Sequence, residues 1–357
     1  MIVDTKYITL YRDAPLALES GATLSPVTVA YETYGTLNHD RSNAILICHA
    51  LTGSCHAAFY NDASEKYAGW WDGLIGNGIE SGKAFDTEKY FVLCSSVLGG
   101  CYGTSGPTSL DPDTEKKTGL SFPRVSIRDM VEVQARLATE LGIDQFLAVA
   151  GGSMGGFQVL EWAAMFPSRV RSIIPVSTGL SHSAWAIAHS HAQREAIMCD
   201  PLWRQGAYEV QPHGLKVARQ MAMISYRSPE SFTEKFSRAL SDDGSRFQVE
   251  TYLTYQGEKL SARFDANTYI RLTEAMDGHD LARGRGSMAE ACERITAKTL
   301  SIGTESDKLY IAAEQKEIAR LIANAEYLDI PSQFGHDAFL IEYDFLNRHI
   351  SEFLRTL

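Results

Sequence analysis

Runs of apolar and β-branched residues alternate with turn-forming residues in the first hundred positions of the chain. Three such runs lie at residues 27–36, 44–50 and 90–97, and turn-forming stretches such as LNHDRSN separate them. Runs of this length between turn signals predict β-strands. From Ser126 the apolar residues recur at helical spacing, which predicts a helix that Ser126 caps and Gly142 ends.

Strand-like and helix-like segments alternate through the middle of the chain. QFLAVA at residues 145–150 predicts a strand, a helix follows to about Phe166, and VRSIIPVS at residues 170–177 predicts the next strand. Strands that alternate with helices imply right-handed crossovers and a mostly parallel sheet. We therefore expect an α/β fold.

The alternation stops over residues 181–295, which are helix-like almost throughout and rich in Met, Arg, Gln and Ala. It resumes at residues 298–304 with the strand KTLSIGT, followed by a helix, the strand AEYLDIP and a closing helix from about Ala338. We expect one α/β core built from residues 1–180 and 296–357, with residues 181–295 inserted as a helical lid.

Composition and charge narrow the classes of protein to consider. The net charge of -11 argues against binding to nucleic acid or to anionic membranes, which need basic surface. The N-terminal MIVDTKYITL lacks the pattern of a signal peptide, and no apolar stretch approaches the ~18 to 20 residues of a membrane span. Six cysteines in 357 residues do not suggest a disulfide framework. We expect a soluble protein of the reducing cytoplasm.

The segment AVAGGSMGGFQVLEWA contains the motif G-x-S-x-G around Ser153. A serine hydroxyl attacks a carbonyl only when it is exposed, near a base and beside donors that stabilise the oxyanion. In this motif a tight turn between strand and helix exposes the serine, and glycines leave room for the strained backbone. A glycine-rich turn with an incidental serine, or a phosphate-binding loop, is the alternative; the strand before and helix after favour a catalytic serine.

The partners of such a serine follow in the order acid and then histidine, each in a loop after a later strand. Asp307 follows the strand that ends near Thr304, with Glu305 as a nearby competitor. Two histidines occur in the same tripeptide, Gly-His-Asp, at His279 and His336. Only His336 follows a predicted strand, so we choose His336 as the base and interpret His279 as a surface or capping residue.

The oxyanion hole of this architecture combines the N–H after the nucleophile with one from a loop after an earlier strand. These criteria select Met154 and Leu51. The same loop repeats a Cys-His pair at residues 48–49 and 55–56, which raises a zinc site as an alternative. Adjacent strand residues point to opposite faces, so four converging ligands are not expected and we predict no metal site.

The chain also resembles a known family over about residues 7 to 355. The segments VAYETYGTLN, ILICHALTG, SSVLGGCYGTSGPTS, GGSMGGFQVLEWA, GLKVARQMAMISYRS, FQVETYLTYQGEKLSARFDANTYI and FGHDAFLIEYD are similar, in nearly colinear order, to those of the homoserine O-acetyltransferase group of α/β-hydrolases. The resemblance implies an α/β-hydrolase fold and acyl transfer from acetyl-CoA to L-homoserine early in methionine synthesis.

The resemblance assigns roles to individual residues of this chain. It implies that Ser153 is the nucleophile, Asp307 the acid and His336 the base of a ping-pong reaction through an acyl-serine, and that Arg219 and Asp337 hold the amino-acid substrate. No metal or redox cofactor is implied. Relatives of this kind are homodimers through the helical insertion, and we expect the same here.

Two of these residues, Arg219 and Asp337, have simpler explanations that the sequence leaves open. Arg219 lies on a mainly apolar helical stripe, where an arginine can extend its charge to solvent or pair with a structural acid, and Arg227 is a second candidate for its role. Asp337 can be the N-cap of the closing helix. The pair Trp70–Trp71 is interpreted as packing rather than as part of the site.

Other activities remain open at this stage. One alternative is an esterase or thioesterase with the same triad. Another is a binding protein that has the hydrolase fold but no catalytic activity. Succinyl-transferring relatives tend to have an arginine two residues after the triad aspartate; here that residue is Leu309, which favours acetyl. L-Serine is an alternative acceptor.

Overall fold

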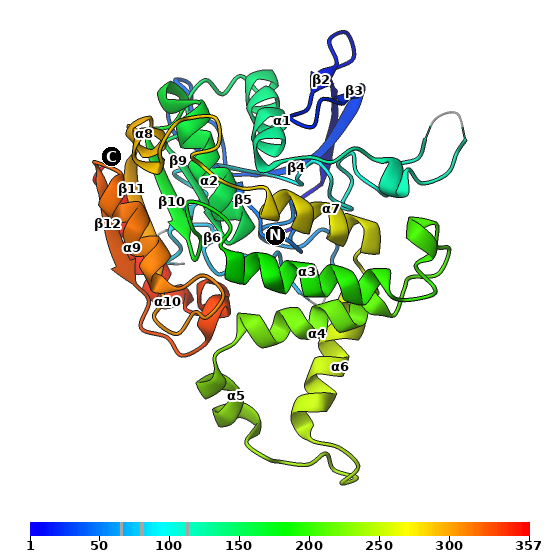
Figure 1. Cartoon of the computed structure of the whole chain (residues 1–357). Coiled ribbons are helices and arrows are strands. Elements are labelled where there is room, and N and C mark those ends of the chain that lie inside the picture. The colour runs from blue at the N-terminus through cyan, green and yellow to red at the C-terminus, as the bar shows by residue number, and fades with distance from the viewer. Residues whose placement is uncertain (65–66, 79–81, 112–113) are drawn as a thin grey trace.

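An eight-stranded sheet forms the centre of the molecule (Figure 1), in the strand order β1-β4-β8-β5-β9-β10-β11-β12. The computed structural model describes residues 1–64, 67–78, 82–111 and 114–357. The sheet strands are β1 (Lys6–Leu10), β4 (Val27–Tyr34), β5 (Ala44–Cys48), β8 (Phe91–Ser95), β9 (Ala148–Gly152), β10 (Ser172–Val176), β11 (Lys298–Gly303) and β12 (Ala325–Asp329). From β8 to β12 all neighbours are parallel, whereas β4 is antiparallel to β1 and β8. The predicted mostly parallel sheet is confirmed.

The central strands are apolar on both faces because helices cover the sheet from both sides. Every residue of β5 is buried, and so is every residue of β9 and β10. Along β5, Leu46 belongs to the apolar cluster on one face, and its neighbours Ile45 and Ile47 belong to the cluster on the other face. A parallel strand covered in this way reads as a continuous hydrophobic run, which is the pattern that predicted it.

Four helices pack against the sheet: α1 (Ile127–Glu140), α2 (Met154–Met165), α9 (Ala312–Leu321) and α10 (Tyr343–Leu354). The predicted start of α1 is confirmed, because the Ser126 hydroxyl accepts the Asp129 N–H and the Asp129 carboxylate accepts the Ser126 N–H. The helix ends beside Gly142, whose φ of 70° favours glycine.

Helices alone fill the span between β10 and β11. They are α3 (Ala184–Met198), α4 (Gly214–Tyr226), α5 (Pro229–Phe236), α6 (Gln248–Ser261), α7 (Ala266–Asp277) and α8 (Met288–Glu293). In Figure 1, α3 and α4 cross below the sheet, while α5 and α6 project away from it. We refer to α3–α8 as the lid; the domain boundaries proposed from sequence remain a prediction. None of the helices in the described ranges has both the length and the apolar character that crossing a membrane requires.

The chain departs from the predicted elements in three places. The closing helix, predicted from about Ala338, begins at Tyr343, and a 3-10 helix at Gly335–Leu340 precedes it. Edge strand β1 was not predicted, nor were the short pairs β2 (Leu16–Ala17) with β3 (Thr23–Leu24) and β6 (Ile75–Gly76) with β7 (Phe85–Asp86). Such short or partly exposed strands carry little apolar periodicity.

The turn from β9 into α2 passes unusually close to the end of β5. A Cβ atom at Gly151 would lie 2.5 Å from the carbonyl oxygen of Cys48, and one at Gly155 would lie nearer still. Glycines at both positions therefore let the start of α2 rest on the backbone of β5. This close approach fixes where the residue between them, Ser153, leaves the sheet.

Replacing Gly155 with alanine should destabilise the fold because the new methyl group meets backbone that cannot move aside. We expect Gly155→Ala to lower the free energy of unfolding by about 1–3 kcal/mol, measured by urea denaturation. Gly278→Ala is the matched control, since its Cβ would meet nothing nearer than 3.6 Å and its φ is -75°. Equal denaturation midpoints for the two variants would contradict the close approach.

Candidate active site

Ser153 lies on a strained turn between β9 and α2. Its φ of 57° and ψ of -124° are unfavourable for a residue with a Cβ atom. Four hydrogen bonds fix this backbone: the Ser153 N–H donates to Val176 O at 2.9 Å, and Ser153 O accepts from the N–H groups of Gly156 and Phe157 and from the Thr178 hydroxyl. The Ser153 hydroxyl makes no capping bond to α2. The hydroxyl is therefore not used to start the helix, and Ser153 is 6% exposed at the end of β9.

Asp307 and His336 form a buried hydrogen-bonded pair. The distance from His336 Nδ1 to Asp307 Oδ2 is 2.8 Å, and the residues are 3% and 1% exposed. The other carboxylate oxygen, Oδ1, accepts the N–H groups of Leu309 and Tyr310 at 2.8 and 3.0 Å. With both oxygens engaged, the carboxylate holds a proton on Nδ1 and leaves Nε2 free to accept one.

Ser153 and the acid–histidine pair leave the sheet at the same edge. Gly152 in β9 aligns with Val176 in β10, and Val176 aligns with Ile302 in β11. The ring of Phe339 connects the two sides, because a Cβ at Gly152 would lie 2.6 Å from it and its centroid is 5.7 Å from that of His336.

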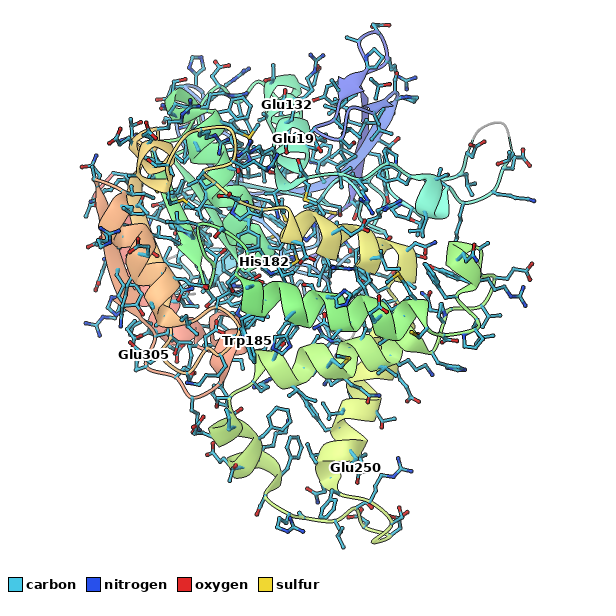
Figure 2. All side chains as sticks on the ribbon, in the orientation of Figure 1. Glu19, Glu132, His182, Trp185, Glu250 and Glu305 are labelled. Carbon is cyan, nitrogen blue, oxygen red and sulfur yellow. The ribbon has the colours of Figure 1, made fainter. Side chains whose placement is uncertain are left out.

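The competing assignments from sequence are resolved by burial. The Glu305 side chain, labelled in Figure 2, is 66% exposed and pairs with Lys316, whereas Asp307 is the acid that bonds His336. The sequence interpretation of His279 as a surface or capping residue is wrong. The residue is 3% exposed, and its ring stacks on that of Phe157 with the centroids 4.1 Å apart. Burial lowers the pKa of His279 well below its ordinary value. The helical pattern around it gave no sign that it packs under α2.

The loop after β5 brings Leu51 to the start of α2. The Gln158 side chain donates to His49 O at 3.1 Å and to Met154 O at 3.1 Å, which ties this loop to the nucleophile helix. Within the part of the chain that the structure describes, the N–H groups of Leu51 and Met154 donate to no protein acceptor. Two free N–H groups in such a place are what an oxyanion needs.

Both ring nitrogens of His49, in the loop that carries the Cys-His pairs, form hydrogen bonds with the backbone. The Val97 N–H donates to His49 Nε2 at 3.0 Å, and His49 Nδ1 donates to Ala50 O at 2.8 Å. Burial lowers the pKa of His49 to about 4, which favours the neutral ring. A neutral ring accepts a hydrogen bond at one nitrogen and donates one from the other, as both backbone contacts require. No group of three or more potential ligands converges among the described residues.

Arg219, on α4, contacts the ring of Tyr226, and that ring in turn lies next to His336. Its guanidinium carbon is 5.4 Å from the centre of the Tyr226 ring, which is 5.5 Å from the His336 ring. Arg219 Nε is buried and has no hydrogen-bond partner among the described residues. Burying a guanidinium nitrogen without a hydrogen-bond partner costs free energy, and a ligand that accepts a hydrogen bond from it would remove that cost.

Asp337 pairs with Arg227, the second candidate from sequence, at 2.9 Å between Oδ2 and Nε. It lies within the 3-10 helix and α10 begins at Tyr343, so its alternative interpretation as the cap of the closing helix is wrong. Burial raises the pKa of Asp337, and the charges of Arg227 and Arg219 oppose that rise. The two arginines thus favour the ionised form of this carboxyl group, against the effect of burial.

Aromatic residues around His336 are the part of the site that sequence analysis missed. The rings of Tyr226, Tyr310 and Phe339 lie 5.5, 5.2 and 5.7 Å from the imidazole. The Trp71 indole N–H donates to Phe339 O at 3.1 Å, so this buried tryptophan supports the site by packing, as predicted. The only signal for Tyr226 was its position seven residues after Arg219 on the same helical stripe.

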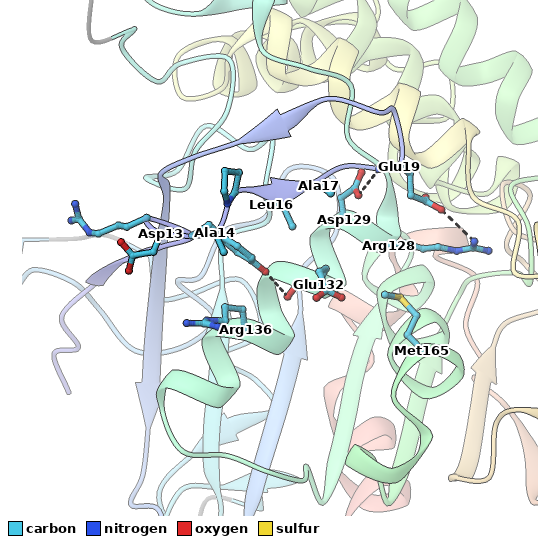
Figure 3. A pocket seen from close by; sticks show the side chains of 13 residues that line it. Asp13, Ala14, Leu16, Ala17, Glu19, Arg128, Asp129, Glu132, Arg136 and Met165 are labelled. Carbon is cyan, nitrogen blue, oxygen red and sulfur yellow. Dashed lines mark hydrogen bonds and ion pairs between the residues drawn. The ribbon is translucent and has the colours of Figure 1, made fainter.

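A separate groove of about 540 Å³ lies at the opposite end of α2 (Figure 3). Residues of the N-terminal segment and of α1 line it, together with Met165 at the end of α2. Two of its charged side chains, Glu19 and Arg128, pair with each other at 3.3 Å. At 1.5 Å per residue, the length of α2 separates this groove from Ser153, so it takes no part in the candidate site.

Glu314, on α9, is a further titratable group near the pair. Burial raises its pKa to about 7, the negative charge of Asp307 adds to the rise, and a hydrogen bond with Ser183 opposes it. Its Oε2 is buried without a hydrogen-bond partner in the described part of the chain. The native state therefore favours the neutral form of this carboxyl.

Comparison with known proteins gives the class first. The sequence model of the alpha/beta hydrolase fold matches residues 43–343, and the chain belongs to that fold family. Esterase E22, at 28% identity, superposes with a TM-score of 0.90 over 99% of this chain and 100% of its own.

Individual relatives identify a narrower family within this fold. Homoserine O-acetyltransferase of Deferribacter desulfuricans is 49% identical, over 100% of this chain and 96% of that protein. The crystal structure of homoserine O-acetyltransferase from Bacillus anthracis matches with a TM-score of 0.92 and 31% identity, over 99% of this chain and 98% of that one. The chain belongs to the homoserine O-acetyltransferase family, a family of acyltransferases. The resemblance inferred from sequence is confirmed.

The raised pKa of Glu314 makes stability depend on pH in a defined direction. As pH rises from about 4.5 to about 7, the unfolded chain loses this proton before the native chain does, so the free energy of unfolding falls. Glu314→Gln should therefore stabilise the protein more at about pH 8 than at about pH 5, measured by urea denaturation. Glu317→Gln, on the same helix but more exposed, should show no such difference. The same effect of Glu314→Gln at both pH values would contradict the burial of a neutral carboxyl.

Proposed function

We propose that this protein transfers the acetyl group of acetyl-CoA to the hydroxyl of L-homoserine. The observation that carries the proposal is the strained Ser153 turn beside the buried Asp307–His336 pair, in a chain 49% identical to a homoserine O-acetyltransferase over its full length. The reaction proceeds in two halves through an acyl-serine.

In the first half, Ser153 attacks the thioester. His336 Nε2 takes the proton from the Ser153 hydroxyl as Oγ bonds to the acetyl carbon, and the N–H groups of Leu51 and Met154 stabilise the oxyanion. When the C–S bond breaks, the proton on His336 passes to the thiolate and coenzyme A leaves as the thiol. Asp307 stabilises the imidazolium and fixes its tautomer.

In the second half, homoserine replaces coenzyme A. His336 accepts the proton of the homoserine hydroxyl, whose oxygen attacks the acetyl-serine through a second oxyanion in the same hole. The proton then returns to Ser153 Oγ as the ester leaves as O-acetylhomoserine. Side chains and backbone N–H groups perform every step, so the proposed reaction requires no metal or redox cofactor.

Arg219 and Asp337 give the site its preference for an amino acid. The Arg219 guanidinium, with a buried Nε that lacks a partner, would bind the homoserine carboxylate. The Asp337 carboxylate would bind the ammonium, and its present partner Arg227 holds it in place. This grip positions the homoserine hydroxyl so that it reacts ahead of water.

The acyl group is assigned as acetyl because a leucine stands at the position where succinyl-transferring relatives tend to carry an arginine. Leu309, two residues after Asp307, is 7% exposed and apolar. An additional carboxylate packed against it would lose its hydration without gaining a partner. The identity of Leu309 does not distinguish the two candidate acceptors, homoserine and L-serine. We propose homoserine because the chain belongs to the homoserine O-acetyltransferase family.

Ester hydrolysis is the second candidate function. It is favoured by the close structural match to esterase E22. The two functions share the same triad and differ in whether water or an amino-acid hydroxyl attacks the acyl-serine.

A homodimer through the lid is part of the proposal. Apolar side chains are exposed on its helices, including Val217 and Ile224 on α4 and Tyr255 on α6. Val217 and Ile224 lie seven residues apart on one helical face, as expected for a surface covered by a second copy.

The compartment we propose is the cytoplasm, where the acetyl-CoA and amino-acid substrates are available. All six cysteines are free thiols in the structure, and four of them are buried. This pattern suits a reducing environment.

Asp307→Asn should remove most of the activity while leaving the fold intact. The asparagine oxygen would take over the N–H groups of Leu309 and Tyr310, which turns the amide NH₂ toward His336 Nδ1. The imidazole must then carry its proton on Nε2, where it cannot accept the serine proton. We expect kcat to fall by about 10³- to 10⁴-fold, measured by release of free coenzyme A. A loss below about tenfold would show that Asp307 does not set the tautomer.

The proposed function itself is tested by release of coenzyme A with and without homoserine. We expect steady release from acetyl-CoA only when homoserine is present, with O-acetylhomoserine formed in equal amount, and much slower turnover of succinyl-CoA. Rapid release without any amino acid would instead establish a hydrolase, and a preference for succinyl-CoA would overturn the acyl assignment.

A further inference from the structure

A pocket of about 340 Å³ opens between α5 and α6, the two lid helices that project from the body of the molecule (Figure 1). Aromatic side chains and two cations dominate its lining: Arg227, Phe232, Lys235, Phe236, Tyr252 and Phe334. No role has been given so far to any of these except Arg227.

The rings and cations of the pocket contact one another. Lys235 Nζ lies 4.6 Å from the centre of the Tyr252 ring and 5.2 Å from that of Phe236. The Phe232 ring meets Tyr252 edge-on at 6.4 Å, and the Arg227 guanidinium lies 5.8 Å from the Phe334 ring. Flat apolar faces beside fixed cations suit a ligand that carries both an aromatic group and phosphates.

The pocket adjoins the candidate active site. Arg227 lines the pocket and pairs with Asp337, the residue after His336. Tyr252 also lines the pocket; burial raises its pKa, and the charges of Arg227, Asp337 and Arg219 act on it. The pocket therefore lies next to the residues proposed to bind homoserine.

The pocket is also a local exception to the charge of the chain. The net charge of -11 opposes binding of phosphates over most of the surface. The lining holds two cations, Arg227 and Lys235, and one carboxylate, Glu234, which accepts a hydrogen bond from the Gln333 side chain. Arg227 is paired with Asp337, so among the described residues Lys235 is the lining cation without an ion-pair partner and the one available to a phosphate.

We propose that this pocket binds the acyl donor, with Lys235 meeting a phosphate of the nucleotide part of coenzyme A and the rings of Phe232 and Tyr252 lining the path of the pantetheine arm toward Ser153. This inference rests on the proposed function and deepens it. The donor enters from the α5–α6 side, so its thiol leaves by the same path and vacates the space beside Asp337 for homoserine.

Lys235→Gln and Phe232→Ala separate the two parts of the donor. With acetyl-CoA we expect Lys235→Gln to raise KM about five- to tenfold, the effect of one charge-assisted contact, with kcat and the KM for homoserine unchanged. With S-acetylpantetheine, which lacks the nucleotide, the same variant should behave as the wild type. Phe232→Ala should raise KM for both donors. Titration calorimetry with coenzyme A alone should show the weakened binding of both variants without any turnover.

Arg238→Gln is the matched control. Arg238 follows α5 and stacks on Phe247 at 5.3 Å, outside the pocket, so its loss changes the charge of the same arm without touching the donor site. We expect wild-type KM for both donors in this variant.

The outcomes distinguish this inference from the proposed function. Unchanged KM and coenzyme A affinity in Lys235→Gln and Phe232→Ala, in an enzyme that turns over acetyl-CoA, would overturn the donor site alone. If those variants instead dissociate into monomers on size-exclusion chromatography with unchanged KM, the pocket is a contact between copies of the chain and the inference fails. A wild-type protein that uses neither donor would overturn the function itself.

Discussion

The strained backbone of Ser153 is the constraint on which the rest of the site depends. A residue with a Cβ atom keeps a φ of 57° only if its surroundings hold it there. Here the start of α2 rests directly on the Cys48 carbonyl because Gly151 and Gly155 have no side chains, and Val176 O and the Thr178 hydroxyl bind the turn from the other side. The buried parallel sheet offsets this strain, and the turn places the Ser153 hydroxyl at the sheet edge without a capping bond to α2.

The chemistry is assembled from segments that lie far apart in the sequence. Asp307 and His336 come from loops that follow β11 and β12, after the chain has returned from the lid, yet they meet the same sheet edge as Ser153. The lid supplies Tyr226, whose ring packs against His336, and Arg219, which lies over the Tyr226 ring. In the proposed reaction the hydrolase core provides the nucleophile and base, and Arg219 of the lid helps to select an amino-acid hydroxyl over water.

Much of the fold and the catalytic constellation could be predicted because each depends on local patterns. Continuous apolar runs identified β5, β9 and β10, and the order of serine, acid and histidine after successive strands follows from the topology. Features that depend on packing between distant segments could not be predicted. The burial of His279 under α2 and the pairing of Arg227 with Asp337 leave no periodic trace in the sequence.

The central claim, that Ser153 carries the acetyl group between the two substrates, is tested most directly by the mass of the protein. Mixed with acetyl-CoA in the absence of homoserine, the chain should gain the mass of one acetyl group, and the modified peptide should contain Ser153. Addition of homoserine should remove that group and yield O-acetylhomoserine. An unchanged mass, or an acetyl group on a different residue that homoserine can discharge, would contradict the account.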